Sequence, residues 1–366
     1  MSDRSNSSPQ PLPHVLRMAP FALADRAVAP GLKAIHLAQN ESPTGPGAAA
    51  RAAIRTATDN LNRYPEADAA TLRQAIAAAE NLDADRIICG SGSMELLALL
   101  AQAYVAPGDE IVLSQYGYVF FRTVAELVGA RFILAPERDY RCDIDAMLAA
   151  VTPRTRMVFL ANPNNPTGTL LPRSEIERLR AGLRGDIILV IDAAYAEYVT
   201  DADYDPGADL VDAGVNTVMM RTFSKIYGLA GLRVGWGCFP APIAAVVNRL
   251  RHPNNVSAIG IAAAAAAVAD RAHVVATRAA NAALLRHFAR DLRALGLAPV
   301  ESHANFVLVP FASVEEAAAA RSALKAEGIL VRPMSAYSLD QCLRITLGLE
   351  AEMQAVIDAL RTWKPA

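Results

Sequence analysis

The feature of the sequence that most constrains the fold is an alternation, between residues 86 and 220, of short apolar runs with longer helical stretches. The runs are rich in Val, Ile, Leu and Met and lack regular polar alternation. They span Arg86–Cys89, Glu110–Leu113, Arg131–Leu134, Met157–Leu160, Ile187–Ile191 and Val218–Met220. Strands of this kind are covered by other elements on both faces. Alternating strands and helices joined by short loops therefore predict a doubly wound α/β domain with a mostly parallel sheet.

The pattern changes after about residue 254. Sequence rich in Ala, Leu and Arg predicts long helices as far as Leu295, where Gly296 is suited to end the last of them. Three further apolar runs, Phe306–Val309, Gly328–Val331 and Leu343–Leu347, predict a small sheet that is followed by a terminal helix. At 366 residues the chain is too long for one ordinary core. We therefore predict an N-terminal tail and arm over residues 1–34, a large domain over residues 35–254 and a smaller α+β domain over residues 255–366.

The composition excludes several classes of protein. Hydrophobic residues make up 53% of the chain and charged residues 20%, which is typical of a globular protein rather than a disordered one. The net charge of −2 provides no attraction to nucleic acid or to an acidic membrane. The 4 cysteines and 6 histidines show no metal-ligand spacing, so we expect no metal site and a reduced, cytoplasmic protein. The alanine-rich run Ile261–Val268 predicts a core helix rather than a membrane span.

The loops after the predicted strands carry more specific patterns, and ligands of α/β folds bind at the carboxyl ends of the strands. Cys89–Met94 (CGSGSM) is a glycine turn before a helix, where backbone N–H groups favour a phosphate. A tight turn without a ligand explains this pattern equally well. Asn162–Gly168 (NPNNPTG) is more specific, because two prolines and a glycine make a rigid loop that holds asparagine side chains in set directions.

Charged side chains follow two further strands. Asp192 comes after Ile187–Ile191, and a buried carboxylate is costly unless it meets a positive group such as a protonated pyridine nitrogen. An aspartate that caps the next segment is the alternative. Lys225 lies among small and apolar residues, where desolvation lowers the pKa of an amine and suits it to form a Schiff base. Arg233 follows a glycine-rich turn, and its planar fork suits a phosphate.

Taken in order along the chain, GSGS, NPNNPTG, DAAY, TFSK and GLAGLRVG resemble the motifs of the fold type I aminotransferases, which use pyridoxal 5′-phosphate (PLP). Within that superfamily the sequence most resembles the histidinol-phosphate aminotransferases. The resemblance covers nearly the whole chain, from Leu37–Pro43 (LAQNESP) to Leu343–Gly348 (LRITLG). It implies a PLP-binding large domain, a homodimer, and transamination between histidinol phosphate and 2-oxoglutarate in histidine biosynthesis.

The resemblance also implies roles for individual residues around the cofactor ring. Lys225 is implied to hold the cofactor as a Schiff base and then to move a proton between substrate and cofactor. Asp192 is implied to pair with the pyridinium nitrogen, so that the ring remains an electron sink. Asn165 and Tyr195 are implied to hydrogen-bond the 3′-oxygen of the ring, and Tyr118 to stack on its face.

A second group of residues is implied to bind the cofactor phosphate. These residues are Ser93 and Met94, through their backbone, together with Ser224 and Arg233. Tyr64 is implied to reach the same phosphate from the second subunit, which is why an obligate dimer is expected.

Arginines are expected to bind the substrate anions, since the guanidinium fork suits a carboxylate and a phosphate alike. Arg344 matches the family position that takes either anion, and Arg332 matches a second arginine that contacts phosphate. For Arg332 alone, an ordinary solvated arginine is the alternative. Asn40 and Asn165 are expected as polar neighbours of the substrate.

The sequence departs from the common family pattern at Phe21, Thr44, Tyr116 and Ser257. Phe21 stands where some members have a tyrosine whose hydroxyl helps to hold the substrate phosphate. Two alternatives on the same scaffold therefore stay open: an aromatic amino-acid aminotransferase, which would use Arg344 but not Arg332, and a PLP enzyme of a specialised pathway with different chemistry. A PLP-binding regulator without activity is disfavoured, because the catalytic domains occupy nearly the whole chain.

Overall fold

The computed structural model describes residues 9–19, 27–214 and 216–363, and its centre is a seven-stranded sheet in the order β2-β10-β9-β8-β7-β3-β4. The strands are β2 (Ile87–Gly90), β3 (Glu110–Ser114), β4 (Arg131–Ala135), β7 (Thr155–Ala161), β8 (Ile188–Asp192), β9 (Thr217–Thr222) and β10 (Gly235–Cys238). All neighbours are parallel except β10, which runs antiparallel to β2 and β9. The six strands that the apolar runs predict are confirmed, and no end is shifted by more than two residues.

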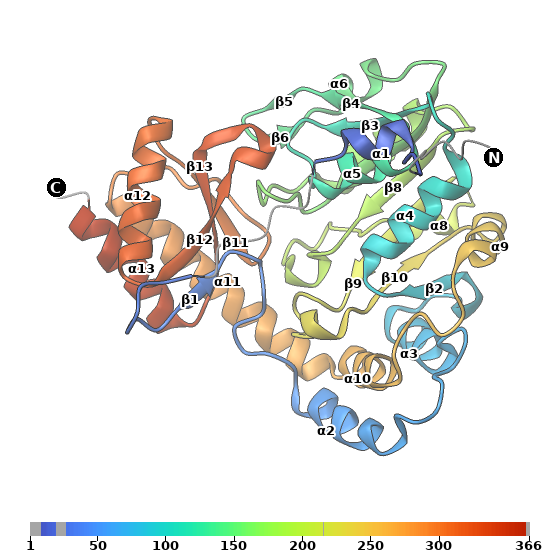
Figure 1. Ribbon diagram of the computed structural model, residues 1–366, viewed down its shortest axis with the longest axis horizontal. Coiled ribbons are helices and arrows are strands. Elements are labelled where there is room, and N and C mark those ends of the chain that lie inside the picture. Colours follow the sequence, from blue (N-terminus) through green and yellow to red (C-terminus); the bar gives the residue numbers. More distant parts are fainter. Residues whose placement is uncertain (1–8, 20–26, 215, 364–366) are drawn as a thin grey trace, which may run out of the picture.

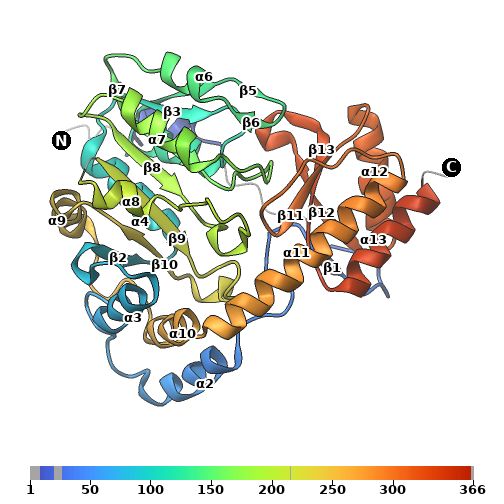
Figure 2. The same cartoon turned by 180° about the vertical axis from the view of Figure 1, so that it is seen from behind.

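Helices cover both faces of this sheet, as the unbroken apolar strands predict (Figures 1 and 2). One face packs against α4 (Ser93–Tyr104), α5 (Phe120–Leu127) and α9 (Ala241–Leu250). The other packs against α6 (Ile144–Ala149) and α7 (Arg173–Gly182), with α8 (Ala208–Asp212) nearby. Adjacent residues point to opposite cores: Ile111 contributes to the first and Val112 to the second. Such strands carry no polar face, which explains the missing alternation.

A second sheet of four strands has the order β1-β12-β13-β11. It consists of β1 (Ile35–Leu37), β11 (Phe306–Pro310), β12 (Ile329–Met334) and β13 (Leu339–Thr346). The helices α11 (Arg271–Ala294), α12 (Val314–Ala326) and α13 (Glu350–Trp363) lie around it, and Figure 1 shows this unit beside the large sheet. The predicted small sheet and terminal helix are confirmed, and α11 ends just before Gly296, whose φ of +73° is typical of a helix stop.

The predicted domain boundaries at residues 35 and 255 stay a prediction. Two elements near these boundaries contact the other domain than the one to which the prediction assigns them. Residues 35–37 are expected in the large domain, yet they form β1, a strand that extends the small sheet through parallel pairing with β12. α10 (Ala258–Ala269) is expected in the small domain, yet it packs against α2 (Ala48–Ala57) and α3 (Ala70–Glu80). Its small side chains, including Ala263 and Ala267, allow this close approach, so the predicted core helix is confirmed.

Strand β10 has no counterpart among the predicted strands because it contains two glycines, which weaken a strand pattern. A side chain at Gly235 would place its Cβ 2.2 Å from the backbone nitrogen of Ser93. Close packing of β10 on the turn before α4 therefore requires glycine at position 235. This glycine weakens the strand pattern in the sequence. The sequence also did not predict a short hairpin, formed by β5 (Glu137–Arg138) and β6 (Arg141–Cys142), or the helix α1 (Pro13–Arg17).

No single helix within the described ranges is long and apolar enough to cross a membrane, although α10 and α11, bent by 74° at their junction, reach the required length and composition as a pair.

Candidate active site

The predicted site residues of the large sheet meet at the carboxyl ends of three adjacent parallel strands. In register, Ala161 of β7 pairs with Asp192 of β8, and Asp192 pairs with Met220 of β9. The loops that follow these strands therefore leave the same edge of the sheet, and they contain Asn165, Tyr195 and Lys225. The small sheet faces this edge through β13, so the site lies between the two sheets.

Asp192 is 5% exposed, and its Oδ1 accepts a hydrogen bond of 3.1 Å from the amide of Ala194. Burial raises the pKa of Asp192 to about 6, which the amide of Ala194 and the charge of Lys225 only partly offset. A buried carboxyl without an ion-pair partner favours the arrival of a positive group. This environment supports the expected pairing with a pyridinium nitrogen, while the bond from Ala194 is the contact that the alternative, an aspartate that caps the next segment, predicts.

Lys225 follows β9 and is half-buried at the cleft between the sheets. Its Nζ donates a hydrogen bond of 3.0 Å to the carbonyl oxygen of Gln39 and lies 5.7 Å from the centre of the Tyr195 ring. Burial, together with the positive charges of Arg344 and Arg233, lowers the pKa of Lys225 to about 7. A large fraction of the amine is therefore neutral at physiological pH and able to attack an aldehyde.

The start of α4 provides hydrogen-bond donors that suit a phosphate. The backbone amides of Ser93 and Met94 donate to no residue in the described part of the chain, as expected for the first turn of a helix. Nη1 of Arg233 lies 3.3 Å from Oγ of Ser224, and Nη2 lies so close to Gly92 that a Cβ there would be 2.6 Å away. The structure thus brings together all the residues predicted to bind the cofactor phosphate, apart from Tyr64.

Asn165 and Arg344 join the two sheets. Nη1 of Arg344 donates a hydrogen bond to Oδ1 of Asn165, and Nη2 donates one of 2.8 Å to the carbonyl of Ala38. The guanidinium also lies 5.3 Å from the centre of the Phe306 ring, and its Nε has no hydrogen-bond partner within the described ranges. Nδ2 of Asn165 remains available to donate to a ligand, as expected for a group that binds the 3′-oxygen of the cofactor.

Asn40 holds Tyr195 in place. Nδ2 of Asn40 donates a hydrogen bond of 2.8 Å to the hydroxyl of Tyr195, and its Oδ1 accepts one of 3.1 Å from Thr346. Because Asn40 is 1% exposed and both polar ends of its side chain are bound, the structure places it behind Tyr195. Nδ2 of Asn40 has a second N–H group, so a contact of this side chain with substrate needs no break in these bonds and stays a prediction.

Arg332 lies directly opposite Arg344 across β12 and β13. Residues opposite each other in an antiparallel pair share one face of the sheet, so the two guanidinium groups extend to the same side. Arg332 is half-buried and forms no hydrogen bond or ion pair with any described residue, and Arg344 forms no ion pair there. Like charges opposite each other are destabilising unless an anion lies between them. This makes the alternative of an ordinary solvated arginine the weaker interpretation.

Tyr118 and Tyr64, which are both expected to contact the cofactor, lie in different surroundings. The hydroxyl of Tyr118 lies 3.8 Å from Sδ of Met94, and its ring packs edge-on against Phe121 at 5.6 Å, so it borders the expected cofactor site. Tyr64, by contrast, is 92% exposed. Leu61, three residues before it, is also exposed.

The structure shows the surroundings of three of the four positions that depart from the family pattern. Ser257 caps α10, since its Oγ accepts a hydrogen bond of 3.0 Å from the amide of Gly260. Thr44 is exposed and lies 3.3 Å from the hydroxyl of Ser42. The ring of Tyr116 packs at 6.2 Å from that of Tyr140. Phe21 lies outside the described residues.

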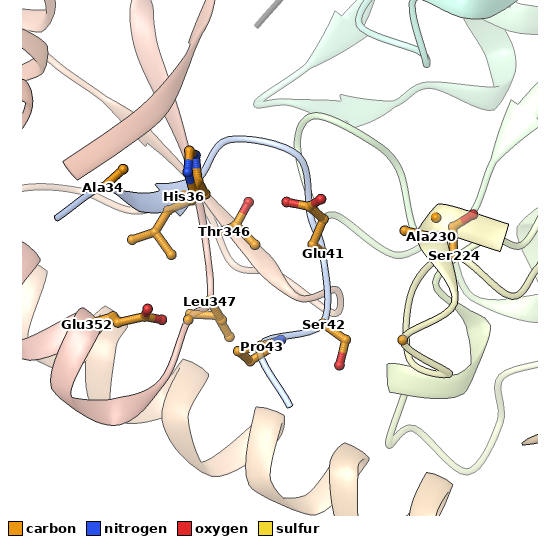
Figure 3. A pocket seen from close by; sticks show the side chains of 14 residues that line it. Ala34, His36, Glu41, Ser42, Pro43, Ser224, Ala230, Thr346, Leu347 and Glu352 are labelled. Carbon is orange, nitrogen blue, oxygen red and sulfur yellow. The ribbon is translucent and has the colours of Figure 1, made fainter. Parts of the chain in front are cut away.

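An open cavity of about 410 Å³ adjoins the site (Figure 3). The loop after β1 contributes Glu41 and Ser42, the segment after β9 contributes Ser224, and the small domain contributes Thr346 and Glu352. Within the described residues, no group of three or more His, Cys, Asp or Glu is placed to hold a metal ion.

The residues present fit PLP on three observations of the structure. The unpaired amides at the start of α4 suit its phosphate, the buried carboxyl of Asp192 suits its ring nitrogen, and the amine of Lys225 suits its aldehyde. Gln39 and Thr346, which support Lys225 and Asn40, were missed by sequence reasoning. Gln39 acts through its backbone carbonyl, so its side chain gives no signal.

Fold and site together define a family, and the chain belongs to the class I and II aminotransferases, whose family model matches residues 33–360. A histidinol-phosphate aminotransferase from Rhodospirillum rubrum is 50% identical over 355 residues, with 96% of each chain covered. One from Dinoroseobacter shibae is 50% identical over 90% of this chain and 91% of its own length. The crystal structure of the histidinol-phosphate aminotransferase from Sinorhizobium meliloti in complex with PLP has a TM-score of 0.89, 30% identity and 98% coverage of both chains. The aspartate aminotransferase from Thermus thermophilus, with a TM-score of 0.81 and 22% identity, shares the fold.

Proposed function

We propose that this chain is a PLP-dependent aminotransferase that transfers an amino group between histidinol phosphate and 2-oxoglutarate, a reaction of histidine biosynthesis. The observation that carries the substrate assignment is the pair Arg332 and Arg344, opposite each other on β12 and β13 without a carboxylate partner among the described residues. Two guanidinium groups suit a phosphate, which carries up to two charges, better than the single charge of a carboxylate. The names of the relatives from Rhodospirillum rubrum and Dinoroseobacter shibae agree with this assignment.

When bound, PLP supplies an electron sink for the negative charge that develops at the substrate Cα. Asp192 would hold a positive charge on the ring nitrogen, and Asn165 and Tyr195 would orient the ring through its 3′-oxygen. Lys225 would take the proton from the substrate Cα and donate it to C4′ of the cofactor, for which an amine with a pKa of about 7 is well matched. Arg344 binds the α-carboxylate of glutamate, and both arginines bind the phosphate of histidinol phosphate.

The decisive experiment adds L-glutamate and histidinol phosphate separately to the purified protein and follows the visible absorbance of the cofactor. We expect both compounds to convert the yellow form to the pyridoxamine form at comparable efficiency. Reaction with glutamate and L-phenylalanine but not with histidinol phosphate would support an aromatic aminotransferase instead. Absence of reaction with all amino donors would support the alternative of different PLP chemistry.

The kinetics of Arg332→Ala with a phosphate-containing donor and with an aromatic donor distinguish the two aminotransferase assignments. Loss of one charged hydrogen bond costs about 1.5–3 kcal/mol, so kcat/KM for histidinol phosphate should fall roughly 10- to 100-fold. The value for an aromatic donor, which carries only a carboxylate, should change by less than about threefold. Equal effects on both donors would count against phosphate recognition by Arg332.

The active unit that we propose is a homodimer in which Tyr64 of each subunit completes the site of the other. An aromatic side chain that is 92% exposed, close to the exposed Leu61, supports an interface there. Mixing Tyr64→Ala chains with Lys225→Ala chains tests this, because only a hybrid dimer contains one site with both residues intact. Random exchange should restore about one quarter of wild-type activity. Absence of rescue would place Tyr64 in the site of its own subunit.

We also propose a cytoplasmic location, which the four free cysteines support.

A further inference from the structure

Tyr337 is a buried phenol at the boundary between the two sheets that sequence reasoning did not single out. It ends the short helix η5 (Ser335–Tyr337) between β12 and β13 and is 5% exposed. Its hydroxyl oxygen accepts a hydrogen bond of 3.4 Å from the amide of Val119, and Arg122 Nη1 donates one of 3.4 Å to the carbonyl of Ala336. The turn that carries Tyr337 therefore lies against the start of α5, next to Tyr118.

The proton of the Tyr337 hydroxyl has no acceptor among the described residues. The oxygen accepts from Val119, but the O–H group donates to no residue in the part of the chain that the structure describes. Burial raises the pKa of Tyr337, and Arg344 only partly offsets this, so the proton is retained at neutral pH. A buried donor without an acceptor is costly and rare in folded proteins. The hydroxyl of Tyr337 is therefore able to donate to a bound ligand.

The surroundings of Tyr337 indicate that this ligand is an anion. Arg344, Arg332 and Arg122 all exert a positive field on the phenol, and none of the three forms an ion pair with a described carboxylate. Arg344 and Arg332 share one face of the small sheet, while Arg122 comes from α5 on the opposite side of the boundary. A carboxylate can be bound by one arginine fork, whereas a phosphate has a third oxygen that needs another donor.

We propose that Tyr337 donates its hydroxyl proton to the phosphate of the amino substrate, bound between Arg332 and Arg344, and thereby selects a phosphate over a carboxylate. The inference rests on the proposed function for its substrate, but the residue assignment is new and separable from it. Because the donor comes from the small domain and its neighbour Val119 from the large domain, a bound phosphate would also be held at the boundary between the two.

Tyr337→Phe tests the proposal, since it removes only the hydroxyl. We expect kcat/KM for histidinol phosphate to fall about tenfold or more, the effect of one hydrogen bond to a charged group. For histidinol, which lacks the phosphate, and for L-glutamate, the change should stay below about twofold. The dissociation constant of histidinol phosphate from the pyridoxamine form, which cannot react with it, should rise by the same factor in calorimetry.

A second readout does not depend on the identity of the substrate. Inorganic phosphate should inhibit the reaction of the wild-type enzyme with L-glutamate, and its inhibition constant should rise about tenfold in Tyr337→Phe. If histidinol phosphate does not react but this shift is seen, the substrate assignment is wrong and the phosphate contact stands. If phosphate does not inhibit the wild type, or inhibits both proteins equally, the contact itself is wrong.

Tyr140→Phe is the matched control. It also removes a phenol hydroxyl at the boundary between the sheets, where the Tyr140 oxygen lies 4.0 Å from Sγ of Cys342 and no arginine donates to it. We expect its kinetic constants to equal those of the wild type. Equal losses for all three amino donors in Tyr337→Phe would mean that the hydroxyl only anchors Val119, and would overturn the proposal.

Discussion

Arg344 of β13 donates a hydrogen bond to Asn165, which lies in the loop after β7, so one bond links the small sheet to the large one at the centre of the site. The same guanidinium is the group expected to bind the substrate anion. The bond to Asn165 therefore fixes the direction of the guanidinium before substrate arrives, and this preorganisation lowers the cost of binding.

Replacing Asn165 by aspartate should introduce a carboxylate that competes with the substrate anion for Arg344. A carboxylate at position 165 gives Arg344 a permanent ionic partner, so a substrate anion must displace it. We expect KM for glutamate and for histidinol phosphate to rise by roughly tenfold or more, measured by steady-state kinetics. Asn165→Ala removes the partner without adding a charge, and it should increase KM less. A larger increase for alanine than for aspartate would contradict this account.

Gly235→Ala should weaken cofactor binding. Its Cβ would lie 2.2 Å from the backbone nitrogen of Ser93, and such overpacking typically costs about 1–3 kcal/mol. Relief of the clash moves the amide that is expected to bind the cofactor phosphate. We expect a lower melting temperature and a higher dissociation constant for PLP in fluorescence titration. Gly185→Ala is the control, because nothing lies within 4 Å of a Cβ there; similar losses in both variants would refute the argument.

Asp192→Asn should have opposite effects on the stability of the apoprotein and on activity. The folded-state pKa of about 6 is above the ordinary value of 3.8, so the native state retains a proton that the unfolded state releases. Stability contributed by the protonated carboxyl is thus lost as pH rises from about 4 to 6, by about 3 kcal/mol.

Asp192→Asn removes the free-energy cost of ionising this buried carboxyl. At pH 8 we expect the apoprotein of Asp192→Asn to melt at a higher temperature than the wild type, whereas near pH 4 the two should be equal. Its kcat with cofactor should fall roughly 10- to 100-fold, because the ring nitrogen loses its anionic partner. Calorimetry of the two apoproteins over this pH range, followed by kinetics of the loaded enzymes, would check both parts.

The reaction of Lys225 with PLP should depend on pH in a defined direction. Burial, Arg344 and Arg233 lower its pKa to about 7, and only the neutral amine is nucleophilic. When apoprotein is mixed with PLP, the rate at which the yellow absorbance appears should therefore rise between pH 6 and 8 and then level off. Arg344→Met should move the midpoint to higher pH, because it removes a positive charge. An unchanged midpoint would show that the charge of Arg344 does not contribute to the lowered pKa of Lys225.

The ion pair beneath the site should be essential for stability. Arg221 donates a hydrogen bond of 2.8 Å to Glu197, both residues are buried, and the guanidinium lies 5.4 Å from the centre of the Trp236 ring. Arg221→Met leaves the buried carboxylate of Glu197 without its main partner, which typically costs about 3–5 kcal/mol. Urea denaturation should show this loss, and Arg221→Met combined with Glu197→Gln should recover part of it.

Much of the large domain could be predicted because its signals are local. Strands such as Met157–Leu160 are buried on both faces and therefore read as apolar runs, and the chemistry-bearing residues Asp192 and Lys225 come directly after strands. Elements with weak local signals were missed. β1 has three residues, and β10 contains glycines that its neighbours require.

The sequence by itself determined the α/β class and pointed to one edge of the sheet, with a lysine, an acid and arginines, as the proposed site, because these signals depend on residues close together in the chain. Only the tertiary structure decided that Arg332 lies opposite Arg344, that Asn40 donates to Tyr195, and that the hydroxyl of Tyr337 donates to none of the described residues. These relationships join residues that are far apart in sequence or depend on strand register. A hydrogen-bond partner or its absence becomes defined only when the two sheets are packed together, so no local pattern records it.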